Sequence, residues 1–169
     1  MNVGKQFEQD FSKSVPDSVL IYRLPDAAQS FGGGNLRFSR KNPFDYIMYD
    51  GSTLFALELK TVKGKSISFE RMKEDSGDIH YHQIVGLNEW NKYRGTICGF
   101  VVNFRDLERT VFIPIHKFNE LVENTTKKSL NINDLVGNVI EIGTEKVRTR
   151  YRYDIEKFIN DAASPPWEG

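Results

Sequence analysis

Residues 45–60, DYIMYDGSTLFALELK, predict two neighbouring strands joined by a tight turn. Asp50-Gly51 is a strong hairpin signal, and it lies between two runs rich in aromatic and aliphatic residues, 45–49 and 54–60. Side chains alternate between the two faces of a strand, so Glu58 and Lys60 lie on one face together. Charges on a packed face are costly unless they are paired or bind a metal, so this pair indicates a chemical role.

The length of the turn decides how Asp45, the first residue of the hairpin, lies relative to Glu58. A two-residue turn makes them diagonal neighbours, with Cβ atoms roughly 7–8 Å apart or less. A four-residue turn places them directly opposite each other. We therefore expect any turn of even length to bring the two carboxylates close enough to share a divalent ion, whereas an odd length separates them.

A site for Mg²⁺ or Mn²⁺ is the chemistry that this arrangement favours. Two carboxylates, a backbone carbonyl and waters are the oxygen ligands that these ions prefer, so the candidate ligands are Asp45, Glu58 and the carbonyl of Leu59. Lys60 beside them would orient or deprotonate an attacking water and stabilise charge on a phosphate. Glu8 borders the apolar stripe of the first predicted helix and could reach the ion or its water; alternatively it is a solvated flank residue. The hairpin also has a structural interpretation, an edge-strand salt bridge between Glu58 and Lys60 with Asp45 as a turn residue.

The rest of the chain predicts an α/β fold, a mixed central sheet flanked by helices. Apolar residues at four-residue spacing predict a helix from residue 3 that Pro16 ends. Further strands are expected at 19–24, 96–104, 110–115 and 139–142, and further helices at 79–92, 116–124, 133–136 and 154–160. In a single domain, 1–169, we expect a flexible Gly-rich basic loop at 27–42, a polar loop at 62–78 and a polar tail at 161–169.

The composition narrows the class of protein further. With 39% hydrophobic and 12% aromatic residues, the chain is too rich in core-forming side chains to be disordered. No run reaches the roughly 18–20 apolar residues that span a bilayer, and the first residues lack the apolar segment of a secretory signal. Cys98 is the one cysteine, which fits a reducing compartment, so we expect a cytoplasmic protein without membrane contact.

Charge is segregated along a chain whose formal net charge is zero, with 23 Lys and Arg against 23 Asp and Glu. This balance argues against binding nucleic acid through bulk basicity. However, residues 35–66 carry six cations and three acids, and residues 146–152 carry four cations and no acid. Neutrality therefore does not exclude DNA, but it leaves selectivity to the shape of the DNA.

Eight cations are candidate contacts to DNA phosphates: Arg37, Arg40, Lys41, Lys63, Lys65, Arg71, Arg148 and Arg150. The cations that follow the hairpin have an alternative role in an ordinary solvated loop. In a strand over 146–152 the four cations would share one face, either to contact phosphates or to protect a sheet edge. His80 and His82 are two residues apart, so on a helix they would point about 200° apart rather than toward one metal.

Together these motifs resemble the RecU-type Holliday junction resolvases, a branch of the PD-(D/E)xK nuclease superfamily, in the short form found in phages. The resemblance runs from about residue 4 to 159, nearly the whole chain. It is carried by Gly4-Lys5-Gln6-Phe7-Glu8, Asp45, Glu58-Leu59-Lys60-Thr61, Ser68-Phe69, His80-Tyr81-His82-Gln83-Ile84 and Arg152-Tyr153-Asp154-Ile155.

This resemblance implies a restriction-endonuclease-like core and a metal-dependent endonuclease that cuts four-way DNA junctions as a homodimer, in a bacterial host cell and among recombination proteins. In such a nuclease, Asp45 and Glu58 would ligate Mg²⁺ and Lys60 would be the catalytic lysine. Glu8 would complete the metal side, and Gln83 would lie over the site. The segment 27–42 would be a short form of the stalk that the family inserts into the junction. Two alternatives stay open: another PD-(D/E)xK nuclease acting on linear or flapped DNA, or a catalytically silent protein that binds branched DNA or a recombinase.

Overall fold

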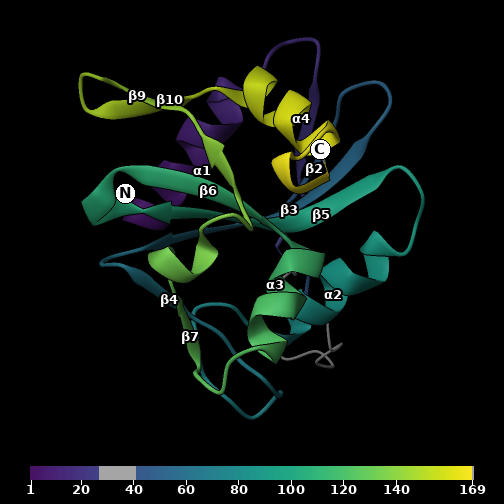
Figure 1. Ribbon diagram of the computed structural model, residues 1–169. Coiled ribbons are helices and arrows are strands. Elements are labelled where there is room, and N and C mark those ends of the chain that lie inside the picture. Colours follow the sequence, from purple (N-terminus) through teal and green to yellow (C-terminus); the bar gives the residue numbers. More distant parts are fainter. Residues whose placement is uncertain (27–40, 169) are drawn as a thin grey trace, which may run out of the picture.

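The structure is a computed structural model that describes residues 1–26 and 41–168, so most of the predicted loop at 27–42 lies outside the described residues. Within them, a six-stranded sheet has the order β1-β2-β3-β5-β6-β8 (Figure 1). Its strands are β1 (Leu20–Arg23), β2 (Tyr46–Tyr49), β3 (Leu54–Val62), β5 (Thr96–Phe104), β6 (Arg109–Pro114) and β8 (Ile140–Ile142). β3 and β5 are parallel, whereas the other neighbouring pairs are antiparallel. The predicted mixed sheet is confirmed.

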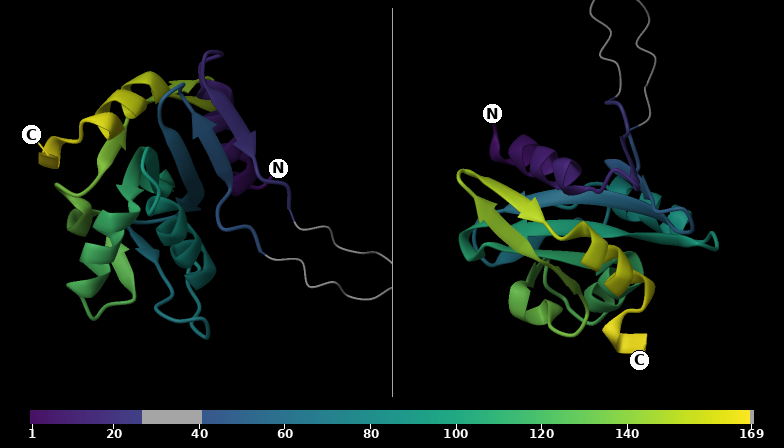
Figure 2. Two further views of the ribbon diagram at one scale, coloured as in Figure 1. Left: turned by 90° about the vertical axis from the view of Figure 1, so that its right-hand side faces the viewer. Right: turned by 90° about the horizontal axis from the view of Figure 1, so that it is seen from above.

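Helices lie on both sides of this sheet (Figure 2). α1 (Val3–Ser14) and α4 (Ile155–Ala163) bury Phe11 and Phe158 in a core on one face. α2 (Tyr81–Asn91) and α3 (Ile115–Glu123) bury Leu87 and Phe118 in a core on the other face. A central strand between two covered faces must be apolar on both, which explains the nearly continuous burial of β3 and β5.

The start of α2 matters for the site, and it differs from the prediction by two residues. Ile79 forms a bridge with Phe69, so the chain is still extended there. His80 is the N-cap, with an extended backbone, and the helix begins at Tyr81. The sequence pattern placed the helix start at residue 79 because an apolar Ile79 suits a helix as well as it suits a bridge.

Two small ribbons accompany the sheet in the described chain: β4 (Ser66–Ser68) with β7 (Ser129–Asn131), and β9 (Thr144–Val147) with β10 (Arg150–Tyr153). β4 lies within the polar loop that was predicted at 62–78, and no strand was predicted at the position of β7. Ile67 and Leu130 at its centre pack into the core beneath α3, but one apolar residue in a three-residue strand is too short a pattern to predict. Short 3-10 helices occur at Arg105–Leu107, Ile132–Leu135 and Pro166–Glu168. The predicted tail at 161–169 is therefore helical in part.

The basic stretch 146–152 forms a hairpin rather than the single strand that was predicted. The chain reverses at Arg148, whose backbone φ of 61° is left-handed. Val147 then pairs with Arg150, so Lys146 lies on the face opposite to Arg150. The expectation that all four cations share one face is wrong, because a turn in the middle of the stretch breaks the alternation.

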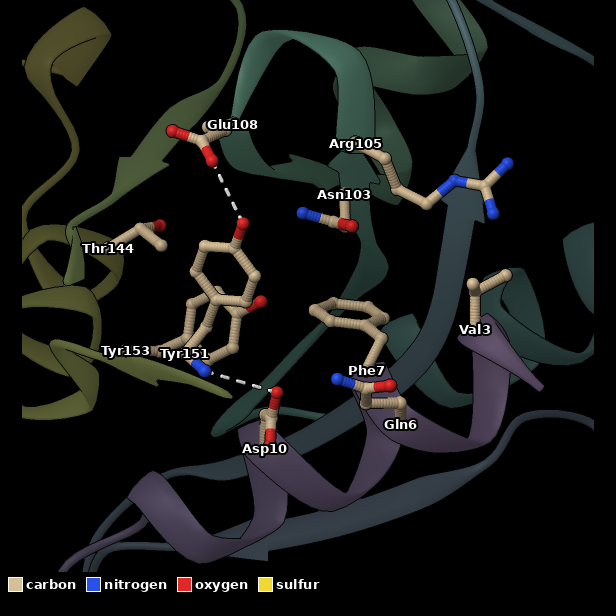
Figure 3. Close-up of a pocket in the computed structure, with 10 residues that line it drawn as sticks. All are labelled: Val3, Gln6, Phe7, Asp10, Asn103, Arg105, Glu108, Thr144, Tyr151 and Tyr153. Atoms are coloured by element: carbon tan, nitrogen blue, oxygen red, sulfur yellow. Dashed lines mark hydrogen bonds between the residues drawn. The ribbon is translucent and has the colours of Figure 1, made fainter. Parts of the chain in front are cut away.

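α1, the β5–β6 connection and the β9–β10 ribbon line a pocket (Figure 3). There, Tyr151 donates its backbone N–H to Asp10 at 3.2 Å and its hydroxyl to Glu108 at 2.9 Å. None of the described residues predicted for the site lines this pocket.

Among the described helices, none has the length and apolar character needed to cross a membrane.

Candidate active site

The β2–β3 hairpin has the four-residue turn, which is one of the two lengths considered from the sequence. Tyr49 pairs with Leu54 and Tyr46 with Leu57, which leaves residues 50–53 in the turn. Asp45 directly precedes this ladder, and its side chain lies close enough to Glu58 to raise the pKa of that acid. The two carboxylates that the sequence singled out are therefore neighbours at the end of the ladder.

Asp45 is held in place by the strand beside it. Its backbone N–H donates to the carbonyl of Leu57 at 3.1 Å, and its Oδ2 accepts the N–H of Leu59 at 3.0 Å. Within an extended strand the N–H and C=O of one residue point to the same side, so the Leu59 carbonyl also faces the side of Asp45. The ladder ends at Tyr46, which leaves this side of Leu59 free of β2.

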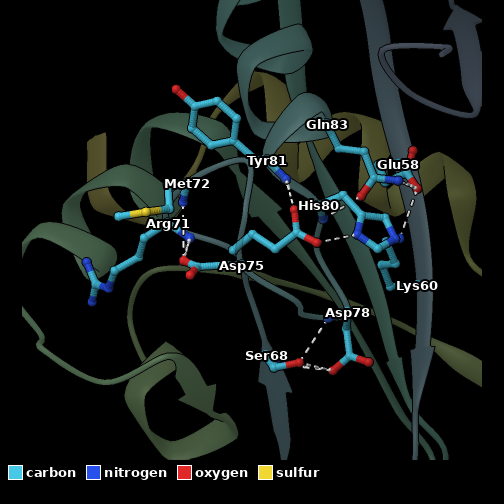
Figure 4. A network of polar contacts seen from close by, with 11 residues as sticks. Glu58, Lys60, Ser68, Arg71, Met72, Asp75, Asp78, His80, Tyr81 and Gln83 are labelled. Carbon is cyan, nitrogen blue, oxygen red and sulfur yellow. Dashed lines mark hydrogen bonds and ion pairs between the residues drawn. The ribbon is translucent and has the colours of Figure 1, made fainter.

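Glu58 is a buried acid with two donors. Only 3% of the residue is exposed, and its Oε1 accepts from Gln83 Nε2 at 2.6 Å and from Lys60 Nζ at 3.3 Å (Figure 4). Burial, and then the charge of Asp45, raise the pKa of Glu58 to about 8, against the opposing effect of Lys60. Burial also raises the pKa of Asp45, against the hydrogen bond from Leu59. Both acids thus resist ionisation in the absence of a cation.

This donor set fits a divalent cation. Two carboxylates that repel each other, one buried and one half-buried, with a backbone carbonyl on the same side, gain from a positive ion between them. Among the residues that the structure describes, no three His, Cys, Asp or Glu side chains are grouped so that they could hold a metal. An ion here would therefore be held by Asp45, Glu58, the Leu59 carbonyl and water.

Gln83 is oriented by the start of α2. Its Oε1 accepts the backbone N–H of His80 at 2.9 Å, so its amide nitrogen must face Glu58. His80 in turn contacts Glu70, through Nδ1 and Oε1 at 2.7 Å, and Glu70 Oε2 accepts the N–H of Tyr81 at the same distance. The sequence did not predict a role for Glu70. It lies ten residues before His80, and the Phe69–Ile79 bridge, with hydrogen bonds between Ser68 and Asp78, brings the two segments together.

Glu8 lies near the site but is paired elsewhere. Its Oε2 accepts from Arg23 Nε at 3.1 Å, and Arg23 also contacts Asp26 at 3.3 Å. Glu8 is one of the charges that raise the pKa of Asp45, which places the two acids in one electrostatic environment. The catalytic role of Glu8 stays a prediction.

The candidate DNA contacts differ in how far their side chains are free. Arg37 and Arg40 lie outside the described residues, whereas Lys41, Lys63, Lys65 and Arg148 are exposed. Arg150 forms an ion pair with the buried Asp10 at 2.7 Å. Arg71 donates to the backbone carbonyls of Val122, Thr125 and Lys127, at 3.3, 2.6 and 2.6 Å. Arg71 and Arg150 therefore have structural partners, and their contact with DNA is untested.

His80 and His82 do not diverge as they would on a helix. Because His80 precedes the helix, their rings stack, with centroids 5.7 Å apart and planes 10° from parallel. The angle of about 200° expected for two helical residues therefore does not apply, because only His82 lies within α2. Burial, with the charges of Lys41, His80 and Lys60, lowers the pKa of His82.

Comparison with known proteins places the site within a matched region. The family model described as RecU, Recombination protein U, matches residues 35–157, which include Asp45, Glu58, Lys60 and Gln83 but not Glu8. The SPbeta prophage-derived uncharacterized protein YotM of Bacillus subtilis (strain 168) is 32% identical over 174 residues, covering 95% of this chain and 86% of that protein. The solved structure of Hjc from Archaeoglobus fulgidus, a Holliday junction resolvase, has a TM-score of 0.47 and 18% identity, over 78% of this chain and 90% of that one.

Proposed function

The chain belongs to the Recombination protein U family, and from that premise we propose that it is a metal-dependent endodeoxyribonuclease that resolves four-way DNA junctions. The observation that carries this proposal is the meeting of Asp45, Glu58, Lys60 and Gln83 at the end of the β2–β3 ladder. A protein that only binds branched DNA has no need for a buried acid, a half-buried acid and a lysine at one place.

Mg²⁺ or Mn²⁺, held by Asp45, Glu58 and the Leu59 carbonyl, would polarise a phosphoryl oxygen and lower the pKa of a water. Lys60, with 17% of its side chain exposed, reaches the site from the same strand face as Glu58 and would stabilise the charge that develops on the phosphate. Gln83 holds the Glu58 carboxylate in one orientation through its contact with Oε1.

The substrate and the assembly follow from the family rather than from the geometry of one chain. Resolution of a junction needs incisions on two opposed strands, which a symmetric homodimer with two identical sites provides. Exposed Lys63 and Lys65, on the β3–β4 connection just past Lys60, would contact phosphates beside the scissile bond. Recombination proteins are the further partners that this role implies.

Incision of a mobile four-way junction, compared with linear duplex of the same sequence, tests the proposal. The reaction is run with Mg²⁺, with Mn²⁺ and with EDTA, beside Asp45→Asn. We expect paired, metal-dependent incision of the junction, little cutting of the duplex, and a loss of activity in the variant. Equal cutting of both substrates would indicate a nuclease of broader substrate range. Binding of the junction without metal-dependent cutting would indicate a silent binding protein.

A further inference from the structure

Glu70 is a second buried acid close to the candidate site, and the backbone around it is rigid. Its N–H donates to the carbonyl of Ile79 at 2.9 Å, and the N–H of Ile79 donates to the carbonyl of Ser68 at 3.0 Å. The residue is 8% exposed. These contacts fix the Glu70 carboxylate relative to the start of α2, although ten residues of chain separate the two.

Both oxygens of Glu70 are used at that helix start. Oε1 contacts Nδ1 of His80 at 2.7 Å and Oε2 accepts the N–H of Tyr81 at 2.7 Å. These hydrogen bonds, the one to His80 first, lower the pKa of Glu70. An ionised carboxylate only accepts, so Nδ1 of His80 must carry the hydrogen. The other ring nitrogen, Nε2, is then available, and 47% of the His80 side chain is exposed.

His80 is tied to the proposed metal ligand by two further hydrogen bonds. Its backbone N–H donates to Gln83, and Gln83 donates to Glu58 (Figure 4). Its ring stacks on His82, whose pKa is lowered by burial and by neighbouring cations that include Lys60. The half-exposed imidazole of His80 thus contacts an ionised carboxylate, while the backbone of the same residue is tied to Gln83 at the site.

We propose that His80 is a catalytic residue, the proton donor to the bridging oxygen that leaves the phosphorus, and that Glu70 is its positioning residue. This inference rests on the proposed nuclease function. As water attacks, a new P–O bond forms and the P–O bond to the leaving strand breaks, with its electron pair going to that oxygen. The Nε2–H of the imidazolium supplies the proton that neutralises this oxygen, while Glu70 keeps Nδ1–H and stabilises the imidazolium. The proton lost by the attacking water goes to solvent.

A bridging-sulfur substrate separates this role from a structural one. A thiolate leaves without protonation, so it needs no proton donor. Four-way junctions are prepared with sulfur replacing the 3′ or the 5′ bridging oxygen at the incision site, and the ends of the wild-type product show which oxygen leaves. Single-turnover incision is measured in Mn²⁺ for wild type, His80→Asn and Glu70→Gln. Asparagine is a good N-cap, so His80→Asn preserves the start of α2. His116→Asn, an exposed histidine on α3, is the matched control.

We expect His80→Asn to slow incision of the oxygen junction by about 100-fold, the lower end of general-acid effects, and to cut the sulfur junction nearly as fast as wild type. Glu70→Gln should lose less of the incision rate on the oxygen junction, and the sulfur junction should restore that rate too. His116→Asn should match the wild-type rate on both substrates. An equal loss on the oxygen and sulfur junctions would overturn the proton-donor role, as would full activity of His80→Asn beside an active wild type. A wild type that incises neither junction with metal would instead overturn the nuclease function, and this role with it.

Discussion

The side-chain amide of Gln83 donates to the buried carboxylate of Glu58 at 2.6 Å, while its carbonyl oxygen accepts the backbone N–H of His80 at 2.9 Å. Helix α2 therefore presents a neutral donor with one defined orientation to an acid whose pKa is raised to about 8. An amide supports the carboxylate in either protonation state without adding charge to the site. The start of α2 thereby fixes the orientation of the Glu58 side chain on β3.

Replacing Gln83 with alanine should weaken metal-dependent incision by about 10–100-fold, the usual cost of losing a group that orients a metal ligand. The dependence of the rate on Mg²⁺ concentration should shift to higher concentration, because the Glu58 carboxylate is no longer held. Val85→Ala is the matched control, since Val85 is an exposed residue of the same helix. Wild-type metal dependence in the Gln83→Ala variant would contradict this orienting role.

The metal-free protein should lose stability as pH rises from about 5 toward 8. The ordinary pKa of Glu58 is 4.5 and burial raises it to about 8, so the folded state holds a proton that the unfolded state releases. This contribution is complete below pH 4.5 and is lost as pH passes through 8. Thermal unfolding in EDTA at several pH values measures it.

Glu58→Gln removes the group that titrates, so its Tm at pH 8 should exceed that of wild type by at least about 2–4 °C, the shift that about 1 kcal/mol causes in a domain of this size. The difference should shrink at pH 5. Added Mg²⁺ should raise the Tm of wild type and not of the variant. A wild-type Tm that rises between pH 5 and 8 in EDTA would contradict the raised pKa.

Arg71→Ala should destabilise the fold by about 1–3 kcal/mol, because it leaves the carbonyls of Val122, Thr125 and Lys127 without their donor. The guanidinium also lies over the ring of Phe69, 5.2 Å from its centroid. We expect a fall in Tm of several degrees and an unchanged affinity for junction DNA. Unchanged stability with weaker DNA binding would indicate that Arg71 contacts DNA instead of stabilising the fold.

Lys63→Ala should weaken DNA binding without changing the stability of the fold. Lys63 is exposed on the connection that follows β3, so its loss should leave the Tm unchanged. The slope of log affinity against log salt should fall by about 1, as expected when one phosphate contact is lost. Lys157→Ala is the control, because that lysine lies on α4, far along the chain from Lys63, and pairs with Asp161 of the same helix. Equal salt slopes for the two variants would remove Lys63 from the interface.

Much of the fold, and the closeness of Asp45, Glu58 and Lys60, could be predicted from local patterns. Apolar alternation and Asp50-Gly51 placed β2 and β3, and the family that residues 58–61 and 80–84 suggested is confirmed by the family match. The spacing of Asp45 and Glu58 left two turn lengths open, because hydrogen bonds inside the turn decide between them. Asp50 Oδ1 accepts the N–H groups of Ser52 and Thr53 and so stabilises the longer one.

The parts that could not be predicted depend on contacts between distant segments. Glu70 is close to His80 because Phe69 bridges Ile79, and no periodicity records such a pairing. Arg71 looked like a solvent-exposed cation because its three carbonyl partners lie more than fifty residues away. The hairpin at Arg148 was missed because a left-handed residue in a turn is usually glycine or asparagine rather than arginine.

The four-residue turn between β2 and β3 makes the length of this turn a condition for the proposed activity. Loss or gain of one residue there would invert β2, exposing the buried Tyr46 and Met48 and turning Asp45 away from Glu58. A change of two residues would preserve both. Drift in this turn is therefore filtered by arithmetic as well as by chemistry, and a relative that has gained or lost a single residue here is marked as inactive even when every catalytic side chain is retained.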